Sequence, residues 1–185
     1  MRKNPAANPV AGAVNGEWLE PLITIRNSPP THEFLKTPTM NIRKASPLHR
    51  EAIITLLQSQ GLPSGDLPQP LQDFYVALEE EKVIGLIGME RYGSFGLLRS
   101  MVVHPDYRNR HIAERLVQLL EEKAKASGTH HMYLLTETAE AYFGRKGYST
   151  ISREDVPAEV QASSEFSHVC PASATVMKKN LITHH

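Results

Sequence analysis

The segment at residues 97–126 joins an apolar run, a short polar loop and an amphipathic stretch. β-branched and other apolar residues predict a strand over 97–103, and Pro105 ends it. The loop at 108–111 holds two arginines and a histidine, and apolar residues then recur at the helical period over 112–124. The first N–H groups of a helix have no internal partner, and the helix dipole adds partial positive charge there. This strand, loop and helix therefore predict an anion-binding site.

Arg99 places a charge inside the apolar run. A buried charge is costly without a partner, so its guanidinium must meet a carboxylate. A substrate carboxylate would suit the bidentate geometry of arginine, and an internal pair with Glu90 or Glu137 is the alternative. Arg99 is therefore a candidate substrate-binding residue.

The elements that must position these residues follow from the hydrophobic period and from the places of proline and glycine. Strands are expected over residues 41–45, 74–78, 83–91, 97–103, 132–135, 148–153 and 175–181. Helices are expected over residues 47–60, 112–126, 140–146 and 156–161. Three successive antiparallel strands and a crossover helix predict an α+β fold with a mixed, mostly antiparallel sheet flanked by helices.

Two stretches between these elements carry further information. Gly85 and Gly88 lie inside a strand, which predicts a bulge or the close packing of another backbone. Three prolines and a glycine over residues 62–70 predict a loop, with one helical turn near Asp66.

Composition limits the class of protein. A chain of 185 residues suits one domain with a proper core. Lys plus Arg and Asp plus Glu both number 20, so the formal charge of zero argues against nucleic acid or an anionic membrane as partner. Cys170 is the single cysteine, so no internal disulfide can form and a reducing, cytoplasmic location is expected. No apolar run approaches the roughly 18 residues of a membrane span, and the N-terminus lacks the apolar core of a secretory signal.

The first 39 residues are rich in Pro, Asn, Thr and Ala, which predicts a poorly ordered N-terminal extension. A short apolar patch at 18–25 leaves docking or an extra strand as the alternative. The folded domain is expected over residues 40–182. The nine histidines do not cluster at metal-ligand spacing, so no metal site is expected.

The predicted anion site resembles the acyl-CoA-binding core of the GNAT N-acetyltransferases. Their pattern is Val-x-Pro, two residues, then Arg or Gln-x-x-Gly-x-Gly or Ala, and Val103, Pro105, Arg108 and Ala113 match it. His111 stands where the family usually has glycine, so its ring must point away from the pyrophosphate or contact it. The resemblance implies acetyl-CoA as co-substrate and no metal.

A second segment, residues 136–148, resembles the GNAT run that begins with Asn and ends Tyr-x-x-x-Gly-Phe. Aligned on Gly147, Phe143 takes the position of the usual general-acid tyrosine and Thr136 that of the asparagine. Tyr142 lies about 100° around a helix from Phe143 and is the candidate acid, with a core position as the alternative. The cofactor-binding residues implied by both segments are Met101, Val102, Val103, Arg108, Asn109, Arg110, His111, Ile112, Ala113, Thr136 and Phe143.

Further motifs resemble the acetyltransferase domain of N-acetylglutamate synthases and, more closely, an arsenic-resistance subgroup of N-acetyltransferases. They lie at residues 85–93, 97–100, 134–139 and 165–174, and the resemblance covers about residues 41–182. It implies acetyl transfer to the amine of a small molecule, an amino acid or an analogue such as an arsenical or phosphinic glutamate mimic. A CoA-binding sensor without turnover, and a protein or polyamine acetyltransferase, are the alternatives. The chain has no acidic run, which disfavours a polyamine.

The implied reaction is direct attack of a neutral amine on the thioester, which needs a base for the ammonium and a proton for the thiolate. Glu90 ends a strand beside the expected acceptor cleft and is the candidate base; a solvated charge is its alternative. Glu137 and Thr138 are candidate substrate-binding residues, with helix capping as the alternative. Cys170 is a candidate arsenical ligand or a small buried hydrophobe. The resemblance leaves a homodimer open, and residues 62–70 are its candidate substrate loop.

Overall fold

The computed structural model describes residues 39–182, except for the side chains of residues 168 and 169. Apart from Thr39, the predicted N-terminal extension lies outside the described residues. The strands are β1 (Asn41–Lys44), β2 (Phe74–Glu79), β3 (Lys82–Tyr92), β4 (Phe95–Val103), β5 (His131–Thr136), β6 (Ser149–Ile151) and β7 (Thr175–Asn180). The α-helices are α1 (Arg50–Ser59), α2 (Ile112–Ala126), α3 (Glu140–Arg145) and α4 (Ala158–Gln161).

Four shorter helical segments complete the described chain. Three are 3-10 turns, η1 (Pro47–His49), η2 (Pro105–Tyr107) and η3 (Arg153–Asp155), and the fourth is a π-helical turn, η4 (Glu165–Val169). Near Asp66 the chain forms a single turn at Gly65 and Asp66 within an irregular loop, and this turn does not extend into a helix. The prolines of the loop fix φ and remove backbone donors, so no longer helix forms there.

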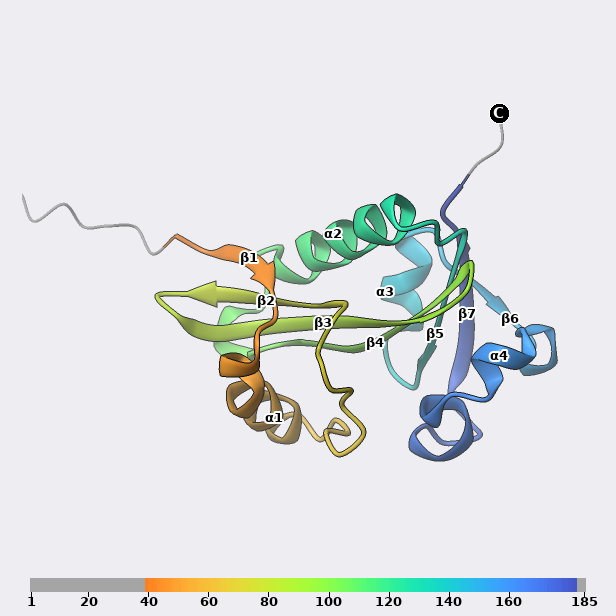
Figure 1. The fold of residues 1–185 in the computed structure, drawn as a ribbon, viewed down its shortest axis with the longest axis horizontal. Coiled ribbons are helices and arrows are strands. Elements are labelled where there is room, and N and C mark those ends of the chain that lie inside the picture. The colour runs from red at the N-terminus through yellow and green to blue at the C-terminus, as the bar shows by residue number, and fades with distance from the viewer. Residues whose placement is uncertain (1–38, 183–185) are drawn as a thin grey trace, which may run out of the picture. The chain divides into compact units, whose positions relative to one another are not determined.

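The seven strands form one sheet in the order β1-β2-β3-β4-β5-β7-β6. All neighbouring pairs are antiparallel except β4 and β5, which α2 connects by a crossover (Figure 1). A parallel pair needs such a crossover because its strands start at the same edge. The prediction of a mixed, mostly antiparallel sheet flanked by helices is confirmed.

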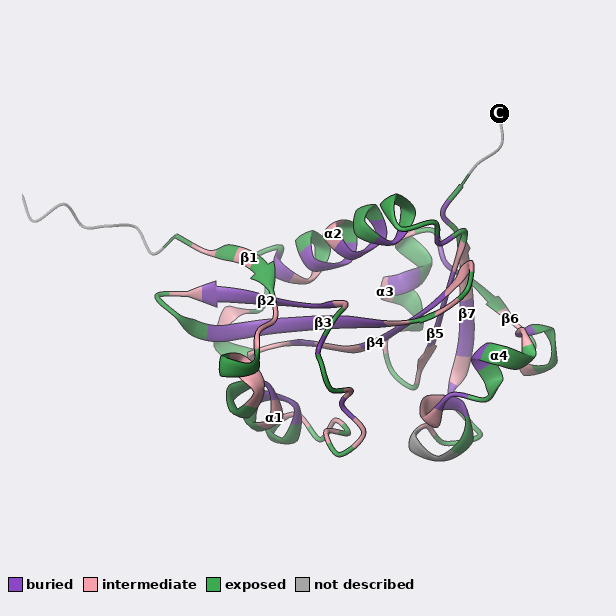
Figure 2. Cartoon of the chain, viewed as in Figure 1, coloured by how far each residue is buried: buried purple, intermediate pink, exposed green. Residues whose placement is uncertain are grey.

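Helices cover both faces of the sheet, as Figure 1 shows. Alternate residues of the strands point to opposite faces: Tyr75 and Ala77 pack in the core under α2, whereas Phe74 and Val76 pack under α1. A third core joins α4 and η4 to β5 and β7. Strands β2 to β5 and β7 are buried in their middle stretches, whereas the edge strands β1 and β6 and the outer faces of the helices are largely exposed (Figure 2).

Gly85 and Gly88 permit close packing on β3. A Cβ on Gly88 would lie 2.3 Å from the Phe74 ring, and one on Gly85 would lie 3.2 Å from side chains of α2. The register of β3 also shifts against β2 and against β4. The predicted bulge is therefore confirmed, whereas the groups that pack closely on the two glycines are side chains and not another backbone.

No helix within residues 39–182 has the length and apolar character that crossing a bilayer requires.

Candidate active site

A cleft opens where β4 and β5 separate. Within the described residues the two strands pair only at Phe95–Leu97 with His131–Tyr133, and Figure 1 shows β5 leaving β4 at a steep angle. The outer edge of β4 from Leu98 onward therefore has no strand beside it. A cavity of about 730 Å³ occupies this place, lined by residues 98–103 of β4 and by Leu134–Ala139.

A bulge bends β4 at the cleft. Leu86 lies opposite Val102 and Gly88 opposite Arg99, so Ile87 alone faces two residues, Ser100 and Met101. Ser100 has φ 56°, in the left-handed region. A bulge leaves its extra residue unpaired and turns the strand. The unpaired edge of β4, with its N–H and C=O groups, is thus directed along the cavity.

The α2 end of the cavity is formed by the loop and helix that follow β4. Val103, Arg108 and Ala113 line it, together with the Gln60–Pro63 turn after α1. Arg108 reaches across and donates from Nη2 to the Gln60 side-chain oxygen at 2.7 Å. Helix α2, which has 15 residues, begins at this end of the cavity, so its first N–H groups lie there. This end has the features of an anion site: a helix N-terminus and one guanidinium.

Four of the predicted cofactor residues do not line the cavity. Arg110 donates to Glu79 at 3.3 Å and stacks on the Tyr107 ring, so its charge is directed elsewhere. Ile112 is buried in the core under α2. Asn109 has φ 62° and shapes the loop through its backbone. These residues position the turn, and their side chains do not reach the cavity.

His111 is the fourth predicted cofactor residue that does not line the cavity, and it stands where the family usually has glycine. It takes φ 57°, the left-handed conformation that a glycine adopts freely. Its ring is 82% exposed and contacts Glu114 at 3.1 Å, and Glu114 also binds Lys146. The pKa of Glu114 is lowered by its hydrogen bonds to Lys146 and His111. The ring therefore points away from the cavity, one of the two arrangements predicted.

The middle of the cavity holds the aromatic pair Tyr142 and Phe143 from α3. Their rings meet edge to face at 5.2 Å, and Phe143 packs on Tyr148 in turn. The Tyr142 hydroxyl is buried and has no hydrogen-bond partner within the described residues. Burial raises the pKa of Tyr142 above the usual 10, with a further contribution from Glu114. The phenol thus keeps its proton at neutral pH.

The turn between β5 and α3, which contains Thr136, forms one wall of the cavity. The Thr136 hydroxyl oxygen accepts from the Ala139 N–H at 2.9 Å, in the turn that leads to α3. Thr136, Glu137 and Thr138 all line the cavity. Thr136 therefore closes the turn that precedes α3 and borders the cavity, whereas the N-cap residue of α3, Ala139, has no side-chain cap.

At the opposite end from α2, the Arg99 end, lies a four-residue charge cluster, which we call the Arg99 cluster. The Arg99 side chain is 0% exposed, and its guanidinium binds Asp66 at 2.7 Å, Glu165 at 3.0 Å and Glu90. Its pKa is raised, because the three carboxylates outweigh the effect of burial. The internal pairing with Glu90 is found as one of the two alternatives; Glu137 is not among the partners of Arg99 within the described residues.

Glu90 lies behind Arg99 and does not line the cavity. It accepts hydrogen bonds from Arg99 and from the Tyr92 hydroxyl, the latter at 2.6 Å. Burial and this hydrogen bond raise the pKa of Tyr92. The Glu90 side chain is 21% exposed and is held by Arg99 and Tyr92, and its role as base remains a prediction.

Two members of the cluster, Asp66 and Glu165, were not singled out by the sequence analysis. Asp66 lies in the loop expected over the acceptor site and also accepts from Ser164 at 3.0 Å. Glu165 lines the cavity and accepts from the Cys170 thiol at 3.0 Å. Glu165 and Cys170 both stand in the 165–174 motif, but nothing in that motif alone shows that they would meet Arg99.

Cys170 lines the cavity beside Glu165. Burial raises its pKa to about 12, with contributions from the hydrogen bond and charge of Glu165. A protonated thiol is a weak ligand for soft metals and arsenicals, since the thiolate is the binding form. No group of three metal-ligating side chains occurs in the part of the chain that the structure describes.

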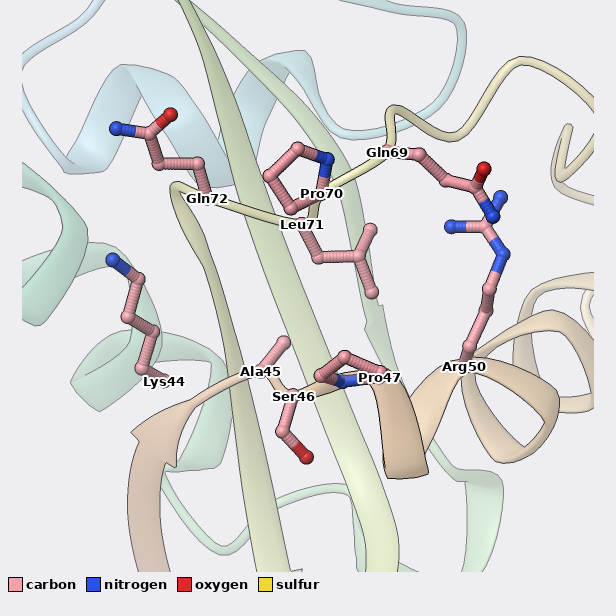
Figure 3. A pocket seen from close by; sticks show the side chains of 9 residues that line it. All are labelled: Lys44, Ala45, Ser46, Pro47, Arg50, Gln69, Pro70, Leu71 and Gln72. Atoms are coloured by element: carbon pink, nitrogen blue, oxygen red, sulfur yellow. The ribbon is translucent and has the colours of Figure 1, made fainter.

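A second cavity of about 480 Å³ lies between the start of α1 and the loop at 69–72. Figure 3 shows Leu71, Ala45 and Pro47 lining its interior, with Lys44 and Arg50 toward the outside. Arg50 donates to the carbonyl oxygens of Leu67 and Pro68 and so ties the loop to α1. Gln69 and Pro70 of the candidate substrate loop line this cavity, but none of the predicted catalytic, cofactor-binding or substrate-binding side chains does.

Comparison with known proteins agrees with this geometry. A family model described as "Acetyltransferase (GNAT) family" matches residues 43–148. A curated relative, an amino-acid acetyltransferase of Proteus mirabilis, is 27% identical over 116 residues, covering 60% of this chain and 26% of that protein. The chain thus spans about a quarter of that relative's length.

Two solved structures share the fold. N-acetylglutamate synthase from Neisseria gonorrhoeae, complexed with coenzyme A and L-arginine, has a TM-score of 0.66 at 16% identity, over 76% of this chain and 33% of that one. Rv2747 from Mycobacterium tuberculosis, in complex with CoA, has a TM-score of 0.66 at 23% identity, over 77% of this chain and 99% of that one. The sheet, the cleft at the β4–β5 separation and the family match together place this chain in the GNAT acetyltransferase family.

Proposed function

We propose that this protein is an acetyl-CoA-dependent N-acetyltransferase that acts on the amine of a small molecule. The observation that carries the proposal is the single 730 Å³ cavity, which runs along the unpaired edge of β4 from the N-terminus of α2 to the Arg99 cluster. It offers backbone groups for an amide-rich chain, an anion site at one end and charged side chains at the other.

The β4 edge and α2 would hold the co-substrate. Backbone groups of Met101, Val102 and Val103 would pair with the pantetheine arm as an added strand does. The pyrophosphate would meet the first N–H groups of α2 and the Arg108 guanidinium. No metal is needed for this contact, because the helix N-terminus and arginine supply the positive charge.

Tyr142 is proposed as the general acid. Tyr142 lines the cavity, and its buried, protonated hydroxyl has no hydrogen-bond partner within residues 39–182, so it has a proton to donate. In the reaction the amine nitrogen attacks the thioester carbon, the C–S bond breaks, and the leaving thiolate takes the Tyr142 proton. The phenolate then recovers the proton that the new N-acetyl group loses.

The acceptor is proposed to be an amino acid or an analogue of one. The relative in Proteus mirabilis, named an amino-acid acetyltransferase, supports this class. Glu137 and Thr138 line the cavity where the acceptor would lie. An arsenical or phosphinic glutamate mimic is the finer proposal, which rests on the motifs at 134–139 and 165–174.

The test is acetyl-CoA-dependent thiol release by the full chain. The acceptor panel contains the free amino acids, their α-amides and phosphinic and arsenic-containing analogues of glutamate. Thiol release with one amino acid or analogue, and an acetylated product of matching mass, is the expected result. Binding of acetyl-CoA without thiol release from any member would instead favour the CoA-binding sensor, and release only with peptides or polyamines would replace the acceptor class.

A further inference from the structure

Glu165 occupies a special position in the Arg99 cluster. Of the three carboxylates that surround Arg99, only Glu165 also lines the cavity. Its side chain is 12% exposed. It stands on η4, beyond residues 43–148 that the family model matches, so the shared family pattern does not account for it.

The charge of the cluster is unbalanced. One guanidinium faces three carboxylates, those of Asp66, Glu90 and Glu165, which leaves two negative charges in excess. Glu137 adds a further carboxylate to the lining of the same cavity. Charges of one sign in a partly enclosed site attract a ligand group of the opposite sign. The group that complements this end is a cation.

The Glu165 carboxylate is held in place but not saturated. Oε1 lies 3.0 Å from Arg99 Nη2, and Oε2 accepts from the Cys170 thiol at 3.0 Å. An ionised carboxylate has about four acceptor positions, so two contacts leave room for further donors. An ammonium carries three N–H donors and suits such a site.

We propose that Glu165 binds the ammonium group of the incoming acceptor and so determines which acceptors enter the cleft. This inference rests on the proposed acetyltransferase function and names a specificity-determining residue for it. The Arg99–Glu165 contact and the Cys170 thiol position the carboxylate. The bound ammonium then gives its extra proton to solvent water, and the neutral amine attacks the thioester. A carboxylate-bearing acceptor without an ammonium group, such as glutarate, is repelled by this end.

The test compares two isosteric substitutions. Glu165→Gln removes one negative charge beside Arg99 at a carboxylate that lines the cavity. Asp66→Asn removes one negative charge beside Arg99 at a carboxylate that does not line the cavity. Thiol release and calorimetric titration of the CoA complex use three probes: L-glutamate, the phosphinic analogue phosphinothricin and spermidine. Urea midpoints and the acetyl-CoA Kd of both variants show that each is folded.

For Glu165→Gln we expect KM and Kd of the amine to rise about 10-fold or more, since the hydrogen bond between the ammonium and a charged carboxylate is lost. The value of kcat and the Kd of acetyl-CoA should stay within about threefold, a factor that corresponds to less than 1 kcal/mol. Asp66→Asn should raise the amine KM clearly less, because it acts only through the field of the cluster.

Equal changes in both variants would overturn the proposal, since the cluster would then act through its charge alone. A lower KM for L-glutamate in Glu165→Gln would also overturn it, because Glu165 would then occupy the place of the substrate carboxylate on Arg99. Titration without turnover separates the two hypotheses: amine binding that depends on Glu165, with no thiol release, supports this inference and rejects the proposed function. Absence of amine binding to the wild-type CoA complex rejects the inference.

Discussion

The two ends of the cavity are built in different ways. The α2 end comes largely from one continuous stretch, β4 to the first turn of α2, and it presents mainly backbone groups. The Arg99 end combines Asp66, Glu90, Arg99 and Glu165 from four separate segments, and it presents charged side chains. One end uses groups that every residue possesses, and the other depends on the identity of each side chain.

This difference indicates which end of the cavity tolerates amino-acid substitutions. At the α2 end His111 replaces the usual glycine, yet the backbone keeps the left-handed turn and the ring points outward. At the Arg99 end three carboxylates share one buried guanidinium, so loss of Arg99 leaves all three without their cation. Substitutions should therefore have large effects at the Arg99 end and small ones at the α2 end.

The largest expected effect is that of Arg99→Met. Removing the guanidinium leaves three carboxylates together without their cation, and breaking such a buried network should cost about 3–5 kcal/mol of unfolding free energy. Urea denaturation measures it. Arg91→Met is the control, because it breaks the more exposed pair with Asp73, which should contribute about 0.2–1 kcal/mol. Equal losses of unfolding free energy in the two variants would show that the Arg99 cluster stabilises the fold no more than an exposed ion pair does.

Tyr142→Phe should lower kcat about 100-fold or more, the usual contribution of a general acid, without changing the acetyl-CoA Kd. The raised pKa means that the phenol stays protonated up to alkaline pH. The wild-type rate should therefore fall only above about pH 10, and this basic limb should be missing in the variant.

Tyr148→Phe is the matched control for Tyr142, since that hydroxyl is also buried but lies outside the cavity lining. Its pKa is also raised, by burial and by Glu121. The two variants are compared by steady-state kinetics across pH. A basic limb that persists in Tyr142→Phe would assign the proton to another group.

Arg108→Ala should raise the acetyl-CoA Kd about 10-fold, the lower range for losing a charge-assisted contact at an exposed position. Arg110→Ala should change it less than about threefold, because Arg110 already pairs with Glu79 and stacks on Tyr107. Calorimetry at low ionic strength compares them. A larger effect for Arg110 would restore the prediction that its side chain binds the cofactor.

The smallest effect is expected for His111→Gly. Glycine adopts φ 57° without strain, so the unfolding free energy should stay the same or rise by up to about 1 kcal/mol. The acetyl-CoA Kd should change less than about threefold, since the backbone makes the contact. Thermal unfolding and calorimetry measure both. A 10-fold loss of affinity would show that the imidazole itself binds phosphate.

The predictability of the site from sequence follows the same division. The fold and the α2 end could be predicted, because strand, loop and helix are continuous and their hydrophobic periods are clear. Arg99 could be recognised as a charge in need of a partner. Its partners Asp66 and Glu165 could not, since they stand 33 and 66 positions away in irregular segments, and no local pattern records which segments meet.

Residues near the α2 end show the same limit in a milder form. Asn109, Arg110, His111 and Ile112 were all expected to contact the cofactor from their places in a motif. A motif records backbone geometry well, but it does not record where each side chain points. Arg110 found a partner in Glu79, 31 positions earlier, which only the folded chain reveals.

The hydrogen bond from Ser164 to Asp66 joins residues 98 positions apart, and this separation affects how the chain acquires its structure. Local contacts form early in folding, whereas closing a long loop carries a larger entropic cost and comes late. The β3–β4 hairpin and α2 can thus organise while Arg99 still lacks Glu165. During synthesis the ribosome must release β5 to η4 before the guanidinium meets its last carboxylate, so the acceptor end matures only after most of the domain has been made.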